Sequence, residues 1–107
     1  MAWTILYYSE KVEQTVLRLP SGLLARYLRL TDLMQEFGPH LGMPHTRSMG
    51  DGLFELRIKG HEGISRVFYC KQAGQRIVML HGFIKKSGNT PLRELRTARQ
   101  RMKEVQT

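Results

Sequence analysis

The sequence has 107 residues, of which 41% are hydrophobic and 24% are charged. These values are typical of one small globular domain spanning residues 1–107, and they exclude a disordered chain and a multidomain protein. No apolar stretch approaches the roughly 18 residues of a membrane span and the N-terminus has no basic signal-like region, so we expect a cytoplasmic protein without membrane contact.

The positive charge is unevenly distributed along the chain. The formal net charge is +8, yet residues 1–54 hold five basic and five acidic side chains, whereas residues 55–107 hold twelve basic and four acidic ones. The whole excess therefore belongs to the second half. This asymmetry predicts a polyanionic partner, such as a nucleic acid, or an acidic protein partner. The single cysteine, Cys70, lies in an apolar run and is expected to be buried and unpaired.

The N-terminal third reads as one strand and two helices. β-branched and aromatic residues predict a strand at residues 3–8. Apolar residues at helical spacing then predict a short helix from Glu10 that stops at Pro20, and a second helix at residues 21–37 that stops at Gly38. Because the connection is very short, we expect an antiparallel helical hairpin with its apolar stripe against a sheet.

The middle of the chain predicts a loop followed by an antiparallel meander. Residues 40–50 are rich in Gly, Pro and His and are expected to form the loop. Three strands follow at residues 53–59, 64–71 and 76–84, separated by short turns. The first alternates apolar residues with Glu55, Arg57 and Lys59, which predicts one buried face and one solvated face. The third is apolar on both faces, which indicates the most deeply buried strand.

The chain ends in a basic helix. Thr90 is a good N-cap and Pro91 occupies the favoured first position of a helix that extends to about Val105. Its apolar residues form only a thin stripe, so we expect it to pack along one narrow line. The order strand, two helices, three strands and helix predicts an α+β fold with the helical hairpin on one face of the sheet.

The common enzyme and metal motifs are missing from the sequence. The four histidines show no HExxH arrangement and the single cysteine no CxxC partner, which argues against a metal site. No GxSxG, Walker loop or GxGxxG follows a predicted strand. The chemistry therefore depends on other residues.

Five basic residues lie on the polar side or at the ends of the meander strands: Arg57, Lys59, Arg66, Lys85 and Lys86. In a meander the end of the third strand lies near the start of the second and the end of the first, so we expect these cations to converge at one rim. Such a rim fits a phosphate group, since arginine binds phosphate oxygens in a bidentate manner and a crowded lysine has a lowered pKa. A solvated basic edge explains the same composition, and the spacing alone leaves both interpretations open.

Three segments carry a family resemblance: MPHTRSMGDGLFELRIKG, ISRVFY and VMLHGFIKKSGNTP. Together with the order of the elements and the tail at residues 99–104, they resemble the phage-derived branch of the RelE/HigB toxins of bacterial toxin-antitoxin modules. The resemblance implies a RelE-like fold and a ribosome-dependent mRNA endonuclease, an mRNA interferase without metal or cofactor, that cleaves translated mRNA and inhibits translation. It also implies a neutralising helix-turn-helix antitoxin of the HigA type, through which alone the toxin meets operator DNA.

The resemblance also suggests roles for individual residues. Arg66 is expected to clamp phosphate, Arg57 to orient the scissile phosphate, and Lys85 or Lys86 to act as general acid or transition-state cation. His81 is a candidate general base, although a hydrogen-bonded core histidine fits its apolar strand equally well.

Five further residues are candidate RNA contacts: Lys59, Tyr69, Arg93, Arg96 and Arg99. Tyr69 either stacks on a base or belongs to the core. The basic last helix fits ribosomal RNA, an acidic antitoxin segment or plain solvation. A non-catalytic RNA-, DNA- or partner-binding module of the same fold is the alternative function, although the sequence lacks a GXXG clamp and other features of common recognition folds.

Overall fold

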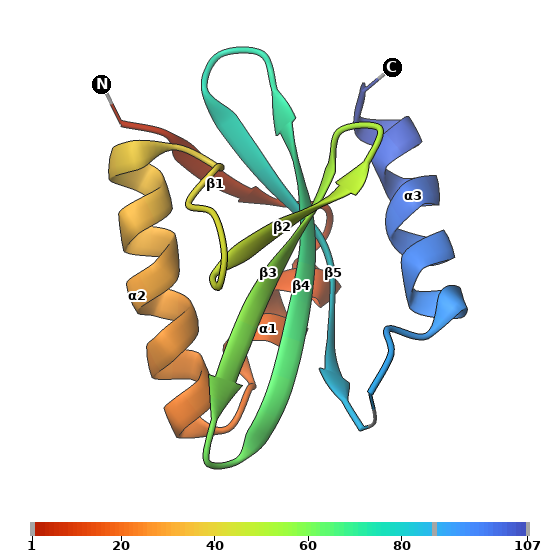
Figure 1. Cartoon of the computed structure of the whole chain (residues 1–107). Coiled ribbons are helices and arrows are strands. Elements are labelled where there is room, and N and C mark those ends of the chain that lie inside the picture. Colours follow the sequence, from red (N-terminus) through yellow and green to blue (C-terminus); the bar gives the residue numbers. More distant parts are fainter. Residues whose placement is uncertain (1, 87, 107) are drawn as a thin grey trace.

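A five-stranded sheet lies between two layers of helices in the computed structural model, which describes residues 2–86 and 88–106 (Figure 1). The elements in chain order are β1 (Thr4–Tyr7), α1 (Glu10–Leu17), α2 (Ser21–Phe37), β2 (Thr46–Gly50), β3 (Leu53–Gly60), β4 (Gly63–Gln72), β5 (Arg76–Lys85) and α3 (Leu92–Gln106). Helices α1 and α2 pack on one face of the sheet and α3 on the other. The predicted α+β class is confirmed, and no helix in the described part of the chain is long and apolar enough to span a bilayer.

The sheet contains the expected meander and two additional edge strands. Its strand order is β1-β5-β4-β3-β2, with β3, β4 and β5 antiparallel and β1 parallel to β5. The prediction of a loop at residues 40–50 is wrong for residues 46–50, because these residues form β2, which pairs with β3. The β2 sequence TRSMG has no apolar alternation. Its extended conformation therefore depends on hydrogen bonding to β3 more than on its own side chains.

The central strand is β4, so the prediction that β5 is buried most deeply is wrong. Six consecutive residues of β4 are buried, from Ser65 to Cys70. Strand β5 lies one position away from the centre, next to β1. From hydrophobicity alone, β5 is expected to be the most deeply buried strand, because β4 carries Ser65 and Arg66, two polar residues whose burial needs partners.

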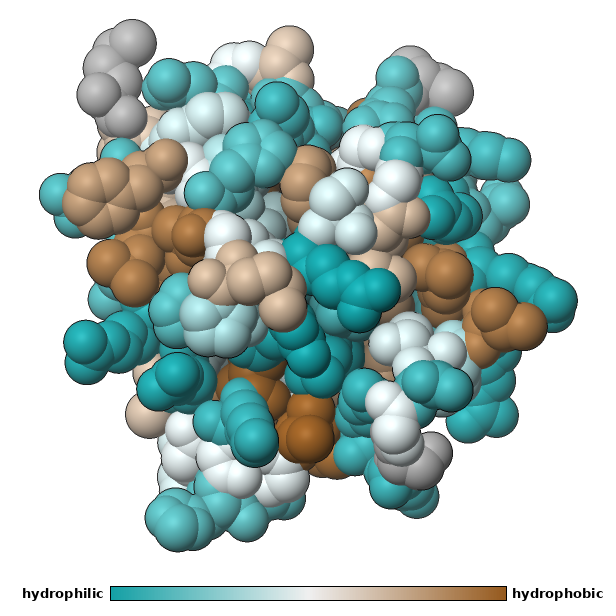
Figure 2. Space-filling model, viewed as in Figure 1, coloured by the Kyte–Doolittle hydropathy of each residue, from teal (hydrophilic) through white to brown (hydrophobic). Residues whose placement is uncertain are grey.

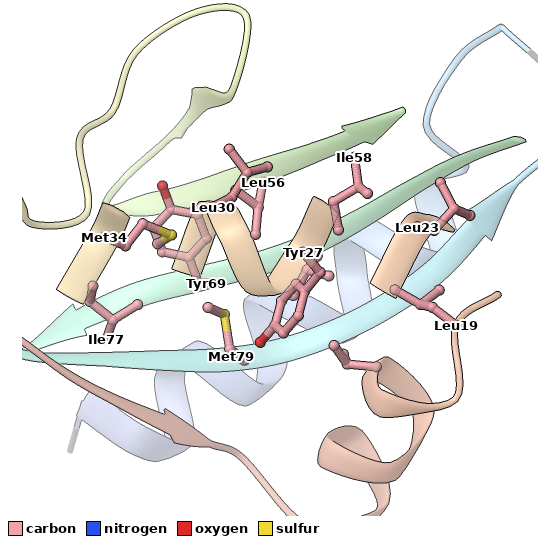
Figure 3. Packing of buried hydrophobic residues seen from close by; sticks show 12 residues of the cluster. Leu19, Leu23, Tyr27, Leu30, Met34, Leu56, Ile58, Tyr69, Ile77 and Met79 are labelled. Atoms are coloured by element: carbon pink, nitrogen blue, oxygen red, sulfur yellow. The ribbon is translucent and has the colours of Figure 1, made fainter. Parts of the chain in front are cut away.

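The larger part of the core lies between the sheet and α2. Leu23, Tyr27, Leu30 and Met34 recur at helical spacing, and Figure 3 shows them facing Leu56, Tyr69 and Met79 of the sheet. Fully burying one such aliphatic side chain stabilises the fold by about 1.5–3 kcal/mol. The hydroxyl groups of Tyr7 and Tyr27 share a hydrogen bond of 2.7 Å, which satisfies the polar end of this buried stripe.

The opposite core covers only half of its face. Its buried members are Leu53, Phe68, Cys70, Val78, Leu80, Ala98 and Met102. The last two belong to α3, and the strand residues lie at the start of β3, toward the end of β4 and toward the start of β5. The remaining half of this face, where β4 begins and β5 ends, carries the polar residues of the predicted rim.

A carboxylate from a distant turn caps α2. The N-cap residue Pro20 offers no side-chain hydrogen bond, and instead the backbone N–H of Gly22 donates to Glu62 Oε2 at 2.8 Å. A Cβ atom at position 22 would overlap this carboxylate, so glycine is required for the close approach. The turn between β3 and β4 is thereby attached to the start of α2.

Candidate functional site

Three rows of side chains cross this face of the sheet, the first beside α3 and the other two on the half that α3 leaves open. The strand register aligns Arg47, Glu55, Phe68 and His81 in the first row, Arg57, Arg66 and Phe83 in the second, and Lys59, Ile64 and Lys85 in the third. Opposed residues of antiparallel strands project from the same face, with Cβ atoms about 4.5–5.5 Å apart. We call Arg47, Arg57, Lys59, Arg66 and Lys85 the basic face. Figure 2 shows strongly hydrophilic side chains gathered in the middle of the molecule, over β2 and β3.

A buried acid, Glu55, holds the basic face together. Its Oε1 lies 3.5 Å from Arg66 Nε and 3.9 Å from Arg57 Nε, while its Oε2 accepts a hydrogen bond from Thr90 at 3.2 Å. The prediction of a solvated face is wrong for this residue, because the two guanidinium groups and the segment before α3 leave it only 2% exposed. A buried carboxylate is stable only when it is paired in this way.

Arg66 is a fixed charge beneath the surface. The residue is 5% exposed, and its Nη1 donates to the carbonyl of Ser65 at 3.2 Å. Burial lowers the pKa of Arg66, while the Glu55 carboxylate raises it and the cations of Arg57 and Arg47 lower it further. Arginine nevertheless stays protonated in proteins. Its charge acts on whatever binds above it.

Arg57 and Lys85 are the more accessible members of the basic face. The Arg57 side chain is 29% exposed, and its Nη1 lies 3.5 Å from Met43 Sδ. Burial and then the neighbouring Arg66, Arg57 and Arg47 lower the pKa of Lys85, against the opposing effect of Glu55. Lys59 is exposed near the end of β3, and Lys86 is exposed directly after the end of β5. The structure thus brings Arg57, Arg66 and Lys85 together.

His81 lies in the first row, beneath the start of α3, with both ring nitrogens engaged. Its Nε2 is 2.8 Å from Glu94 Oε1 and its Nδ1 is 3.3 Å from Arg101 Nη1. A guanidinium group can only donate, so Nδ1 accepts and Nε2 carries the hydrogen that Glu94 receives. These two contacts hold the imidazole ring in one orientation. Nδ1 can accept a proton only after Arg101 moves away.

The candidate RNA contacts are not all on one surface. Tyr69 is completely buried on the α2 side, where its hydroxyl donates to the carbonyl of Pro39 at 2.6 Å. Burial raises the pKa of Tyr69 to about 12. Its ring therefore has no exposed surface on which a base can stack. Arg93 and Arg96 are exposed on α3, whereas Arg99 donates to the Met49 carbonyl at 2.7 Å and attaches the end of β2 to the helix.

The sequence analysis did not predict that Arg47 belongs to this site or that Glu55 is buried in it. The signal for Arg47 is the Asp51-Gly52 pair, a typical two-residue hairpin turn in which both residues have positive φ, here 55° and 87°. A hairpin at that position pairs Arg47 with Glu55 and brings the arginine onto the basic face. Within residues 2–86 and 88–106, no group of three His, Cys, Asp or Glu side chains is arranged to hold a metal ion.

The fold is that of the RelE-type toxins. In the crystal structure of the archaeal RelE-RelB complex from Pyrococcus horikoshii OT3, one chain matches with a TM-score of 0.54 and 17% sequence identity, over 82% of this chain and 100% of that one. The family model described as "Phage derived protein Gp49-like (DUF891)" matches residues 14–103, and the chain belongs to this family. The expected relation to phage-derived RelE-type toxins is confirmed. No curated protein is similar enough in sequence to match.

Proposed function

We propose that this protein is the toxin of a toxin-antitoxin pair and acts as a ribosome-dependent endoribonuclease that cleaves translated mRNA. The observation that carries the proposal is the group of Arg57, Arg66 and Lys85 around one buried acid, on the half of the sheet that the last helix leaves open. Membership of the Gp49-like family supports the same assignment. Such a protein acts in the cytoplasm, where it meets ribosomes.

The basic face suits phosphodiester cleavage by an internal nucleophile. The 2′-hydroxyl of the message attacks the adjacent phosphorus, its proton goes to a base, and the bond from phosphorus to the 5′ oxygen breaks as that oxygen receives a proton. The enzyme must therefore stabilise extra negative charge on phosphate and transfer two protons. In this proposal Arg57 orients the scissile phosphate through its fork of donors, and Arg66 stabilises the developing charge from below. These cations carry the charge stabilisation without a metal ion.

Lys85 is our candidate for the group that protonates the 5′ oxygen. Its pKa is lowered by burial and by the surrounding arginines, which favours proton release. Lys86 follows it as an additional exposed cation. His81 is our candidate for the base. Glu94 orients its ring, and Nδ1 becomes available when Arg101 turns away toward an RNA phosphate.

The proposed function also gives a role to the last helix and to a protein partner. Exposed Arg93 and Arg96 contact ribosomal RNA, a sequence-independent interaction that weakens as salt increases. The antitoxin is a helix-turn-helix protein of the HigA type that connects the toxin to operator DNA. The structurally similar archaeal RelE was crystallised in a complex with RelB, which supports a protein partner for this chain.

The test compares two double variants with the wild-type chain in cells that carry a reporter message. Arg57→Ala with Lys85→Ala removes two accessible cations of the basic face. Lys11→Ala with Arg26→Ala removes the same charge from exposed positions on α1 and α2. We expect wild type and control to halt growth and to cut within translated codons, detected by primer extension. The first variant should fold, by circular dichroism, and cleave at least about 100-fold more slowly.

Two outcomes contradict the proposal. If the wild-type chain cuts no message, or if loss of Arg57 and Lys85 leaves cleavage unchanged, the basic face is not catalytic. A non-catalytic RNA-binding or partner-binding module then becomes the better interpretation, and salt-dependent binding without cleavage is its signature.

A further inference from the structure

Strand β5 leaves half of one edge open. Strand β1 pairs with β5 only from Arg76 to Met79, and the last contact is the Tyr8 N–H donating to the Met79 carbonyl at 2.8 Å. The chain then turns away into α1. On its other side, β5 pairs with β4 as far as Lys85. Residues 81–85 thus have no described strand on the β1 side, and such an edge can pair with another chain.

An apolar cavity lies beside this open edge. Its volume is about 90 Å³, and its walls include Val16 in the last turn of α1, Leu19 just after that helix, Val67 of β4, and Gly82 and Ile84 of β5. A Cβ atom at Gly82 would lie 3.1 Å from Val16 Cγ2, so the glycine keeps this space free. Ile84 is 47% exposed although it is a large aliphatic residue. The cavity therefore offers an apolar side chain of a partner a place to bind.

The two faces of β5 differ in chemistry at this edge. Ile84 faces the cavity on the α1 side, whereas Lys85 lies on the basic face, in the row next to Arg66. A strand added to the edge directs alternate side chains to the two faces. One set would enter the apolar cavity and the other would lie beside Lys85. Arg18 also lines the cavity, so both sides favour negative charge at the rim.

We propose that residues 81–85 bind an extended segment of the inhibitory partner in which apolar and acidic side chains alternate. The apolar residues fill the cavity, and the acidic residues pair with Lys85 and cover the end of the basic face. Main-chain hydrogen bonds supply affinity in this mode and side-chain pockets supply specificity. The inference rests on the proposed function only in identifying the partner as an inhibitor.

Two other occupants fit less well. A second copy of this chain would bring its own basic face to the same edge, and like charges would oppose one another. RNA has no aliphatic side chain for the cavity, and its phosphates fit the basic face directly.

The probe is a synthetic eight-residue peptide of alternating leucine and glutamate, titrated into the full chain. We expect chemical-shift changes and slower hydrogen exchange at the amides of residues 81–85, together with shifts in α1. A peptide of alternating leucine and lysine is the matched control and should not bind. Absence of any change at these amides at millimolar peptide, or equal binding of the lysine peptide, would overturn the proposal.

A pair of variants tests the position of the site. Ile84→Asp should weaken peptide binding at least about tenfold, since it puts a like charge at the cavity. Leu28→Asp is the control, because Leu28 is 46% exposed on α2, away from this edge. Equal affinity of both variants contradicts the assignment. Neither peptide binding nor the amide shifts depend on RNA cleavage. If the peptide does not bind, the nuclease proposal is unaffected, and if the chain does not cleave RNA, the peptide titration still tests this edge.

Discussion

Replacing Glu55 by glutamine removes one negative charge from the centre of the basic face while the shape of the side chain is kept. The glutamine can still accept the hydrogen bond of Thr90, but Arg66 loses its counter-charge although it is only 5% exposed. At the observed 3.5 Å, two unit charges attract each other by about 5 kcal/mol at an effective dielectric constant of 20. Removing one member of a buried pair typically costs about 3–5 kcal/mol.

We therefore expect Glu55→Gln to lower the free energy of unfolding by about 3 kcal/mol. A domain of this size has about 5–15 kcal/mol in total, so the variant should still fold. With a urea dependence of about 1–3 kcal/mol per molar, the unfolding midpoint falls by roughly 1–3 M. The assay is urea unfolding followed by circular dichroism. Glu36→Gln, an exposed acid on α2, is the control and should change stability by less than about 0.5 kcal/mol.

A second variant separates the ion pair from general damage at the site. Glu55→Gln combined with Arg66→Met removes both charges, so the buried arginine is no longer left unpaired. We expect this double variant to recover most of the lost stability. A double-mutant cycle, which also needs the single Arg66→Met variant, reports this recovery as a coupling energy between the two residues. A loss below about 1 kcal/mol for Glu55→Gln, or simple additivity of the two changes, would refute the reasoning.

Three further predictions concern single residues. Glu62→Ala should cost about 1 kcal/mol in urea unfolding, because Gly22 loses the carboxylate that caps α2, while Glu62→Gln should cost less; equal stability of all three chains would contradict this. If protonated Lys85 donates a proton, cleavage falls as pH rises through its lowered pKa, below that of an ordinary lysine, and Lys85→Arg should move this limb upward in a pH-rate profile. Burial raises the pKa of Cys70 to about 11, so the thiol should react with Ellman's reagent at pH 8 only after unfolding; rapid reaction of the native chain would contradict its burial.

The sequence predicts those parts of the fold that depend on local patterns. Helix α2 could be predicted from its apolar spacing and its stop at Gly38, and the meander from its alternation and short turns. Strand β2 could not, because its residues lack strand character and adopt it by pairing with β3. The Asp51-Gly52 turn was the one local sign of this hairpin.

The candidate site also has features that the sequence predicts and features that it does not. The approach of Arg57, Arg66 and Lys85 follows from strand register, which a meander with short turns largely fixes. The burial of Glu55 depends on Thr90, far along the chain, and on two guanidinium groups from different strands. Alternation alone marks an acid in that position as solvated. Only its tertiary partners decide otherwise.

The parallel pairing of β1 with β5 affects the order in which the chain can acquire its structure during synthesis. Thr4 is the partner of Arg76, about 70 positions later, so β1 cannot join the sheet until β5 has been made. Closing so long a loop before any hydrogen bond forms slows folding. The rows of the basic face need β3, β4 and β5 together, and Glu55 needs Thr90 as well. A nascent chain therefore cannot complete this surface until Thr90, which precedes α3, has been made.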